Sequence, residues 1–83
     1  MAHEWRHREG SLLATTMTGR YGSRFHLNVE MIPNGDWDWI VWRAGDSYGV
    51  RYGVARSAKA AMAAAEAAAA WLAETESILA DAD

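Results

Sequence analysis

The sequence predicts an α+β domain in which an antiparallel β-meander of three to four strands packs one face against one long C-terminal α-helix. Two patterns support this fold class. Apolar and polar residues alternate with period two over residues 24–55, and strong helix formers dominate from Ser57 onward. The size agrees with it: 83 residues make a single domain, and five Trp side chains supply apolar surface to a short chain.

Turn-forming residues divide the first part of the chain into strands. The turn signals occupy residues 18–23, 33–35 and 44–47. The expected strands are residues 24–31, 37–42 and 48–55, with residues 12–17 as a weaker fourth candidate. We therefore divide the single domain, residues 1–83, into an N-terminal segment free to be flexible (1–10), a sheet region (11–56) and a helix (57–80).

The turn chemistry predicts which strand faces are buried. The sequence Ile32-Pro33-Asn34-Gly35 favours a type I turn followed by a left-handed Gly, which sets Val29 opposite Trp39. A two-residue Gly45-Asp46 turn would set Trp39 opposite Tyr52. In this register the alanine-rich helix face packs against a core that includes Trp37, Trp39, Tyr48 and Tyr52.

The same register places a second group of side chains on the opposite, uncovered sheet face. These are His26, Trp42, Ile40 and Arg51. Exposed Trp and Arg side chains are typical of the residues that dominate protein interfaces, so this face is a candidate partner-binding surface. A structural alternative is that the Trp42 ring covers Gly49 on the neighbouring strand.

The helix is a second candidate surface because charge is unevenly distributed along the chain. Residues 1–60 carry eight basic and six acidic groups, whereas residues 61–83 carry five acidic groups and no basic one. On a helical wheel, Glu66, Glu74 and Asp81 lie on one side, away from the alanine face. Such a face would attract a basic partner, and the alternative is an ordinary solvated helix surface.

Catalysis and metal binding have little support in the sequence. His3-Glu4-Trp5-Arg6-His7 matches the letters of the zincin motif, but only two residues precede it and no third ligand can be identified. The chain has no cysteine, no phosphate-binding glycine loop and no interpretable Ser/His/Asp set. We therefore expect a non-enzymatic protein with no catalytic residues, no metal and no cofactor.

Targeting segments are also not expected. The charged N-terminus has no apolar core behind it, and the alanine run is interrupted by Glu66. We predict a cytoplasmic protein that does not enter the membrane.

Two resemblances suggest what such a protein does. The order strand–strand–strand–helix, in which Gly53–Ala61 leads from the last strand into the helix, resembles that of small phage and prophage accessory proteins. It is also similar to HicB-like antitoxins, in which a meander ends in a capped, alanine-rich helix. The Pro-Asp-Leu-Pro-Gly stretch typical of HicB proteins is absent. In size and acidity the chain also resembles anti-CRISPR proteins, which implies an inhibitor that docks on a nucleoprotein effector complex.

The functional expectation is a protein-binding inhibitor whose partner is a protein, such as a subunit of a host nucleic-acid-binding complex. The expected binding residues are Trp42, Arg51, His26, Ile40, Glu66, Glu74 and Asp81. The second hypothesis is a single-stranded nucleic-acid-binding module that uses Trp42, His26, Arg51 and Arg24 on the open sheet face, with the aromatic side chains stacking on bases and the arginines near the phosphates. A HicB-like antitoxin and a homodimer that joins two open faces are further alternatives.

Overall fold

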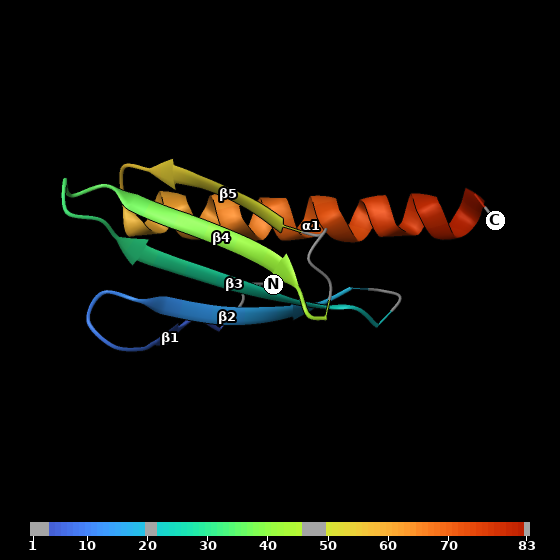
Figure 1. The fold of residues 1–83 in the computed structure, drawn as a ribbon, viewed down its shortest axis with the longest axis horizontal. Coiled ribbons are helices and arrows are strands. Elements are labelled where there is room, and N and C mark those ends of the chain that lie inside the picture. Colours follow the sequence, from blue (N-terminus) through green and yellow to red (C-terminus); the bar gives the residue numbers. More distant parts are fainter. Residues whose placement is uncertain (1–3, 20–21, 46–49, 83) are drawn as a thin grey trace.

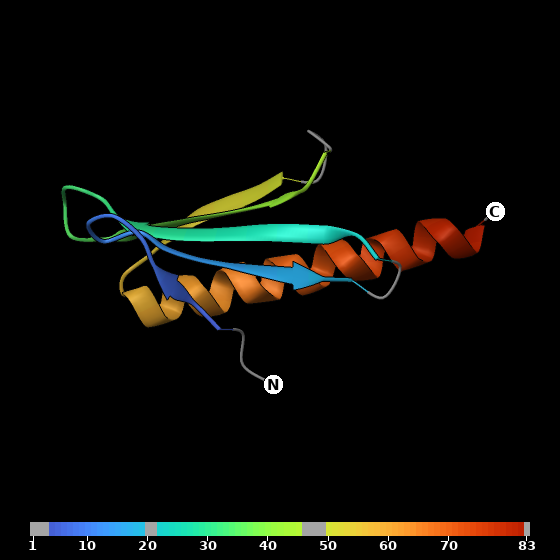
Figure 2. The ribbon, with the colours of Figure 1, turned by 90° about the horizontal axis from the view of Figure 1, so that it is seen from below.

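A computed structural model describes residues 4–19, 22–45 and 50–82, with side chains described up to residue 75. The elements are β1 (Arg6–His7), β2 (Leu13–Thr18), β3 (Arg24–Met31), β4 (Trp37–Arg43), β5 (Val50–Ala55) and α1 (Ala58–Ala82). The strands form one antiparallel sheet in the order β1-β2-β3-β4-β5, and α1 crosses one face of it (Figures 1 and 2). The α+β prediction is confirmed.

The sheet has five strands rather than the three to four expected. The additional strand β1 lies within the N-terminal ten residues, where Arg6 pairs with Ala14 and His7 with Leu13. A turn joins β1 to β2, and in it the Leu12 N–H donates to the Glu9 carbonyl at 3.0 Å. A two-residue strand is too short to show a period of two, so no alternation of apolar and polar residues indicates it.

The turn between β3 and β4 has the predicted form. The Gly35 N–H donates to the Ile32 carbonyl, the Ile32 N–H donates to the Asp36 carbonyl, and Gly35 has a φ of 92°. The predicted register follows, with Val29 opposite Trp39 and Leu27 opposite Val41. These central strands carry the core.

The core is smaller and less aromatic than expected. Its fully buried members are Phe25, Leu27, Val29, Val41, Ala61, Ala65 and Ala69. Trp37 and Trp39 pack at its margin, half-buried, and Tyr52 is 78% exposed, which contradicts its predicted place in the core. Tyr48 lies outside the described residues.

Helix α1 begins where the sequence predicts. The Ser57 side-chain oxygen accepts a hydrogen bond from the Ala60 N–H at 3.1 Å, which satisfies one of the free donors of the first turn. Alanines at positions 61, 65 and 69 face the sheet and let the helix approach closely. The helix lies on one side of the sheet, and in the described part of the chain no element covers the opposite face (Figure 2).

Candidate binding face

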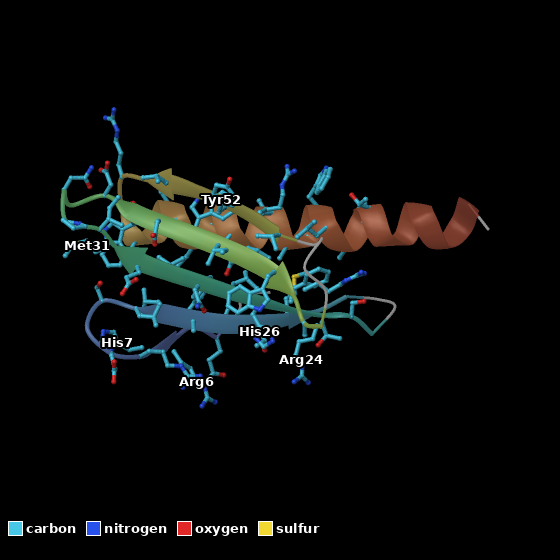
Figure 3. The ribbon with its side chains drawn as sticks, in the orientation of Figure 1. Arg6, His7, Arg24, His26, Met31 and Tyr52 are labelled. Atoms are coloured by element: carbon cyan, nitrogen blue, oxygen red, sulfur yellow. The ribbon has the colours of Figure 1, made fainter. Side chains whose placement is uncertain are left out.

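The uncovered sheet face, which we call the open face, is built from alternate residues of all five strands. Its central row runs across the sheet through Arg6, Ala14, Asn28, Ile40 and Tyr52. The next row contains Thr16, His26, Trp42 and Val50. Figure 3 shows Arg6, Arg24, His26 and Tyr52 on this side of the sheet.

The structure brings three of the predicted site residues together on the open face. His26 and Trp42 are paired across β3 and β4, and their rings stack with centroids 5.2 Å apart and planes inclined by 22°. Ile40 lies in the adjacent row and is 39% exposed. The Trp42 ring thus stacks on a histidine of β3, and the proposed partner Gly49 lies outside the described residues.

Arg51 lies on the opposite side of the sheet from its predicted position. In the structure Trp42 pairs with Val50 and Val41 with Arg51, one residue away from the expected register. A shift of one residue exchanges the two faces of a strand. Arg51 therefore points toward the helix, where its guanidinium lies 4.3 Å from the centre of the Trp71 ring in a cation–π contact.

The packing of Trp39 explains this register. Gly53 lies opposite Trp39, and a Cβ atom on Gly53 would be 2.8 Å from the indole ring. Ala55 lies opposite Trp37, so both half-buried Trp side chains face a small residue on β5. In the predicted register Trp39 would have faced Tyr52 and Trp37 would have faced Val54, both larger than the Gly53 and Ala55 found in these positions.

The corrected register adds two residues to the open face, and one of them, Tyr52, was expected in the core. Tyr52 is 78% exposed and Val54 is 60% exposed. Together with Ile40 and Trp42 they form an apolar half of the open face over β4 and β5, which we call the apolar half. The small residues Gly53 and Ala55, spaced to match Trp39 and Trp37, were the sequence signal for this arrangement.

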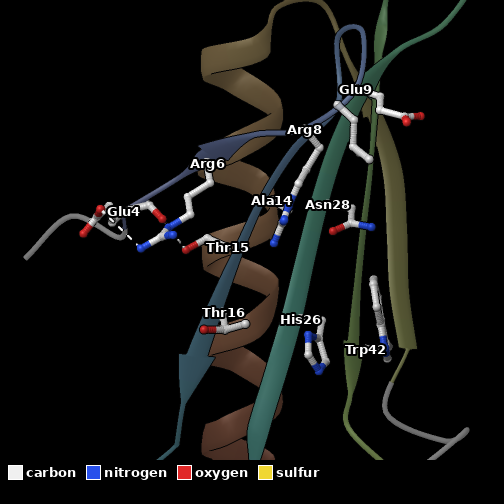
Figure 4. Close-up of a pocket in the computed structure, with 11 residues that line it drawn as sticks. Glu4, Arg6, Arg8, Glu9, Ala14, Thr15, Thr16, His26, Asn28 and Trp42 are labelled. Carbon is white, nitrogen blue, oxygen red and sulfur yellow. Dashed lines mark hydrogen bonds and ion pairs between the residues drawn. The ribbon is translucent and has the colours of Figure 1, made fainter.

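The other half of the open face is polar and hollowed. A hollow of about 690 Å³ lies over β1, β2 and β3 (Figure 4). It is lined by Glu4, Arg6, Arg8, Glu9, Leu12, Ala14, Thr15, Thr16, His26, Asn28 and Trp42. Arg6 forms an exposed ion pair with Glu4 at 4.0 Å, an interaction of little energetic weight in water.

The predicted acidic surface on the helix is only partly present. The Glu66 carboxylate accepts a hydrogen bond from the Trp5 indole N–H at 2.9 Å in a partly buried contact. Glu66 therefore holds the N-terminal segment against the helix and is not part of an open acidic face. Glu74 is exposed, and the side chain of Asp81 lies outside the described residues.

The zincin-like letters near the N-terminus do not form a zincin helix. Arg6 and His7 belong to strand β1, whereas the motif needs both histidines on one helical face. His3 lies outside the described residues. Among the residues that the structure describes, no three His, Cys, Asp or Glu side chains gather as a metal site would require.

Comparison with known proteins adds no relative: no family model, curated protein or solved structure matches the chain. In the described part of the chain, no helix has both the length and the apolar character that crossing a membrane requires.

Proposed function

We propose that this chain is a non-enzymatic protein-binding inhibitor that docks its open face on a partner protein. The observation that carries the proposal is the apolar half of that face, where Tyr52, Val54 and Ile40 are 78%, 60% and 39% exposed. A group of large exposed apolar side chains on one surface is a frequent mark of an interaction site. The opposite sheet face is occupied by α1 and supplies the core.

The composition of the open face fits a protein interface. Tyr, Trp and Arg are the residue types that contribute most to binding energy, and they occur here with aliphatic neighbours. The Trp42 ring is held in place by its stacking on His26, so little side-chain freedom is lost when a partner covers it. The polar half, with Arg6 and Arg8, then supplies the charged rim of the same surface.

The resemblance to anti-CRISPR proteins extends this proposal to a class of partner. The partner would be a protein subunit of a host nucleoprotein effector complex, and docking would block access of nucleic acid to that subunit. The exposed carboxylate of Glu74 and the acidic end of the chain support such a target, because nucleic-acid-binding surfaces are basic.

The test compares the wild-type chain with Ile40→Lys, which places a charge in the apolar half without disturbing the core. Tagged protein is added to lysate of the host, and bound proteins are quantified by mass spectrometry. A genuine partner is enriched by the wild type and by Met31→Lys, whose exposed side chain lies outside the apolar half, and is reduced at least about tenfold with Ile40→Lys. The partner is then purified, and its nucleic-acid binding is measured with and without the inhibitor. Unimpaired binding of nucleic acid would contradict the inhibitory role.

A single-stranded nucleic-acid-binding module is the second candidate, and the hollow beside the stacked pair favours it. Arg6, Arg8 and the exposed side of the Trp42 ring border one hollow, as phosphate and base contacts require. Loss of Arg51 from the open face removes one of the cations that this hypothesis used. Fluorescence anisotropy with labelled oligonucleotides at low salt separates the candidates: salt-sensitive binding that Arg8→Ala weakens supports this second function.

A further inference from the structure

The outer edge of β5 is an unprotected strand edge. β5 is the last strand of the sheet and pairs only with β4. Within the described residues, the backbone hydrogen bonds outside regular elements include none from Val50–Ala55. Natural proteins commonly protect such edges with proline, inward-pointing charges, a bulge or a covering element. β5 contains no proline, and the single charge of its six residues Val-Arg-Tyr-Gly-Val-Ala, on Arg51, is engaged with the Trp71 ring.

Exposed apolar side chains flank this edge on both sides of the sheet. Tyr52 and Val54 project from the open face, and Trp71 of α1, which is 51% exposed, lies on the helix side against Arg51. Three of the five large exposed apolar residues in the described chain thus border one strand edge. A strand added to this edge would gain backbone hydrogen bonds and apolar contacts on both sides.

We propose that the edge of β5 pairs antiparallel with β5 of a second copy of this chain, about a two-fold axis at Tyr52. The sequence of the strand is self-complementary about that residue. On the open face, residues 50, 52 and 54 are Val, Tyr and Val, an order that is the same in both chain directions. The axis sets Tyr52 against its counterpart and each Val50 against Val54 of the other copy, so all three pairs are apolar.

The other face of β5 fits the same axis. Arg51 of each copy lies opposite Gly53 of the other, so no two guanidinium groups meet and each lies beside the Trp39 ring that covers Gly53. Regular antiparallel pairing about a two-fold axis must centre on one residue, because outward-pointing peptide groups alternate along a strand. Centring on Arg51 would place two like charges in direct opposition, which destabilises a pair.

Charge at the two ends of the interface is also complementary. The contact between Arg51 and Trp71 shows that the middle of α1 lies beside the start of β5, whereas the helix begins beyond the end of β5. Antiparallel pairing therefore brings the basic Arg56 and Lys59 of one copy toward the exposed Glu74 of the other. Two such contacts form, one at each end of the shared edge.

The absence of cysteine allows a direct test of this register. Tyr52→Cys, Val54→Cys and Val50→Cys are each treated with a mild oxidant or a short bismaleimide crosslinker. The proposed axis predicts that Tyr52→Cys crosslinks to itself. Val54→Cys does not, because its counterpart is four residues away, about 13 Å along the strand. A mixture of Val50→Cys and Val54→Cys crosslinks as a mixed pair. Equal self-crosslinking of Val54→Cys and Tyr52→Cys would overturn the register.

Charge substitution at the axis tests the association itself by analytical ultracentrifugation. The wild type is expected at about twice the chain mass of 9.2 kDa at high concentration. Tyr52→Lys and Tyr52→Glu should each raise the dimer dissociation constant on the order of tenfold or more, and an equimolar mixture of the two should recover the dimer. Met31→Lys, at an exposed apolar residue distant from the edge, is the matched control and should remain dimeric.

A wild-type chain that stays monomeric up to millimolar concentration would refute the proposal. A dimer that survives Tyr52→Lys but dissociates with Trp42→Ala would show face-to-face pairing of the open faces instead, and would also refute it. Neither result bears on the proposed partner binding, which Ile40→Lys tests separately.

Discussion

The indole ring of Trp39 lies across Gly53 on the neighbouring strand, so closely that a Cβ atom on Gly53 would be 2.8 Å from the ring. This contact sets the alignment of β5 against β4. It therefore decides that Arg51 faces the helix and Tyr52 faces the open side.

Gly53→Ala should destabilise the fold by about 1–3 kcal/mol, because the ring and both strands have to shift to accept a methyl group in a packed region. Urea unfolding measures the free energy of unfolding. Gly19→Ala is the matched control, since a Cβ there has its nearest neighbour at 3.4 Å and its φ is not positive. The control should leave stability unchanged or raise it by about 0.4–1 kcal/mol. Equal effects at both positions would contradict the role given to Trp39.

Removing the indole N–H of Trp5 should loosen the N-terminal hairpin. Trp5→Phe keeps an aromatic ring but removes the donor to Glu66, at a cost of about 1 kcal/mol. We expect faster hydrogen exchange at the amides of β1, with little change in the central strands. Trp71→Phe, on the same helix, should leave exchange in β1 unchanged. Unaltered protection of β1 in Trp5→Phe would show that other contacts hold this strand.

The contact between Arg51 and Trp71 should show measurable coupling in a double-mutant cycle. Arg51→Ala, Trp71→Ala and the double variant should yield a coupling free energy of about 0.5–1 kcal/mol at this exposed position. The ion pair between Arg6 and Glu4, at 4.0 Å and exposed on both sides, is the comparison and should give at most about 0.5 kcal/mol. A coupling free energy near zero for Arg51 and Trp71 would show that this contact does not help to set the strand register, which then depends on the packing of Trp39 against Gly53.

Ser57→Ala should reduce the free energy of unfolding by about 1 kcal/mol, because the Ala60 N–H loses its acceptor at the start of α1. Ser57→Asp retains an acceptor and should stay close to the wild type. Denaturant titration should show a lower midpoint for Ser57→Ala with an unchanged slope. A stability equal to that of Ser57→Asp would show that solvent replaces the cap without cost.

The sequence predicted the parts of the fold that local chemistry determines. The Pro33–Gly35 turn defines the β3–β4 pairing, and Ser57 marks the start of the helix. On the open face, His26, Trp42 and Ile40 were placed correctly because they depend on that one turn.

The features that depend on distant contacts were not predicted. The Gly45-Asp46 dipeptide suggested a tight turn that would set Val41 opposite Val50, but Val50 lies opposite Trp42. That change of one residue moved Arg51 off the open face and brought Tyr52 and Val54 onto it. The hydrogen bond between Trp5 and Glu66 joins residues 61 positions apart, so no local pattern reveals it.

The three buried alanines of α1, at positions 61, 65 and 69, recur almost once per turn. These alanines present the same small side chain at equal intervals, so a shift of the helix by four residues, about 6 Å along its axis, would replace each alanine by the next. The alanine contacts alone therefore define the distance of the helix from the sheet better than its position along the sheet. Two contacts from opposite sheet edges, Trp5 with Glu66 and Arg51 with Trp71, each depend on a single helix residue and therefore fix the position of the helix along the sheet.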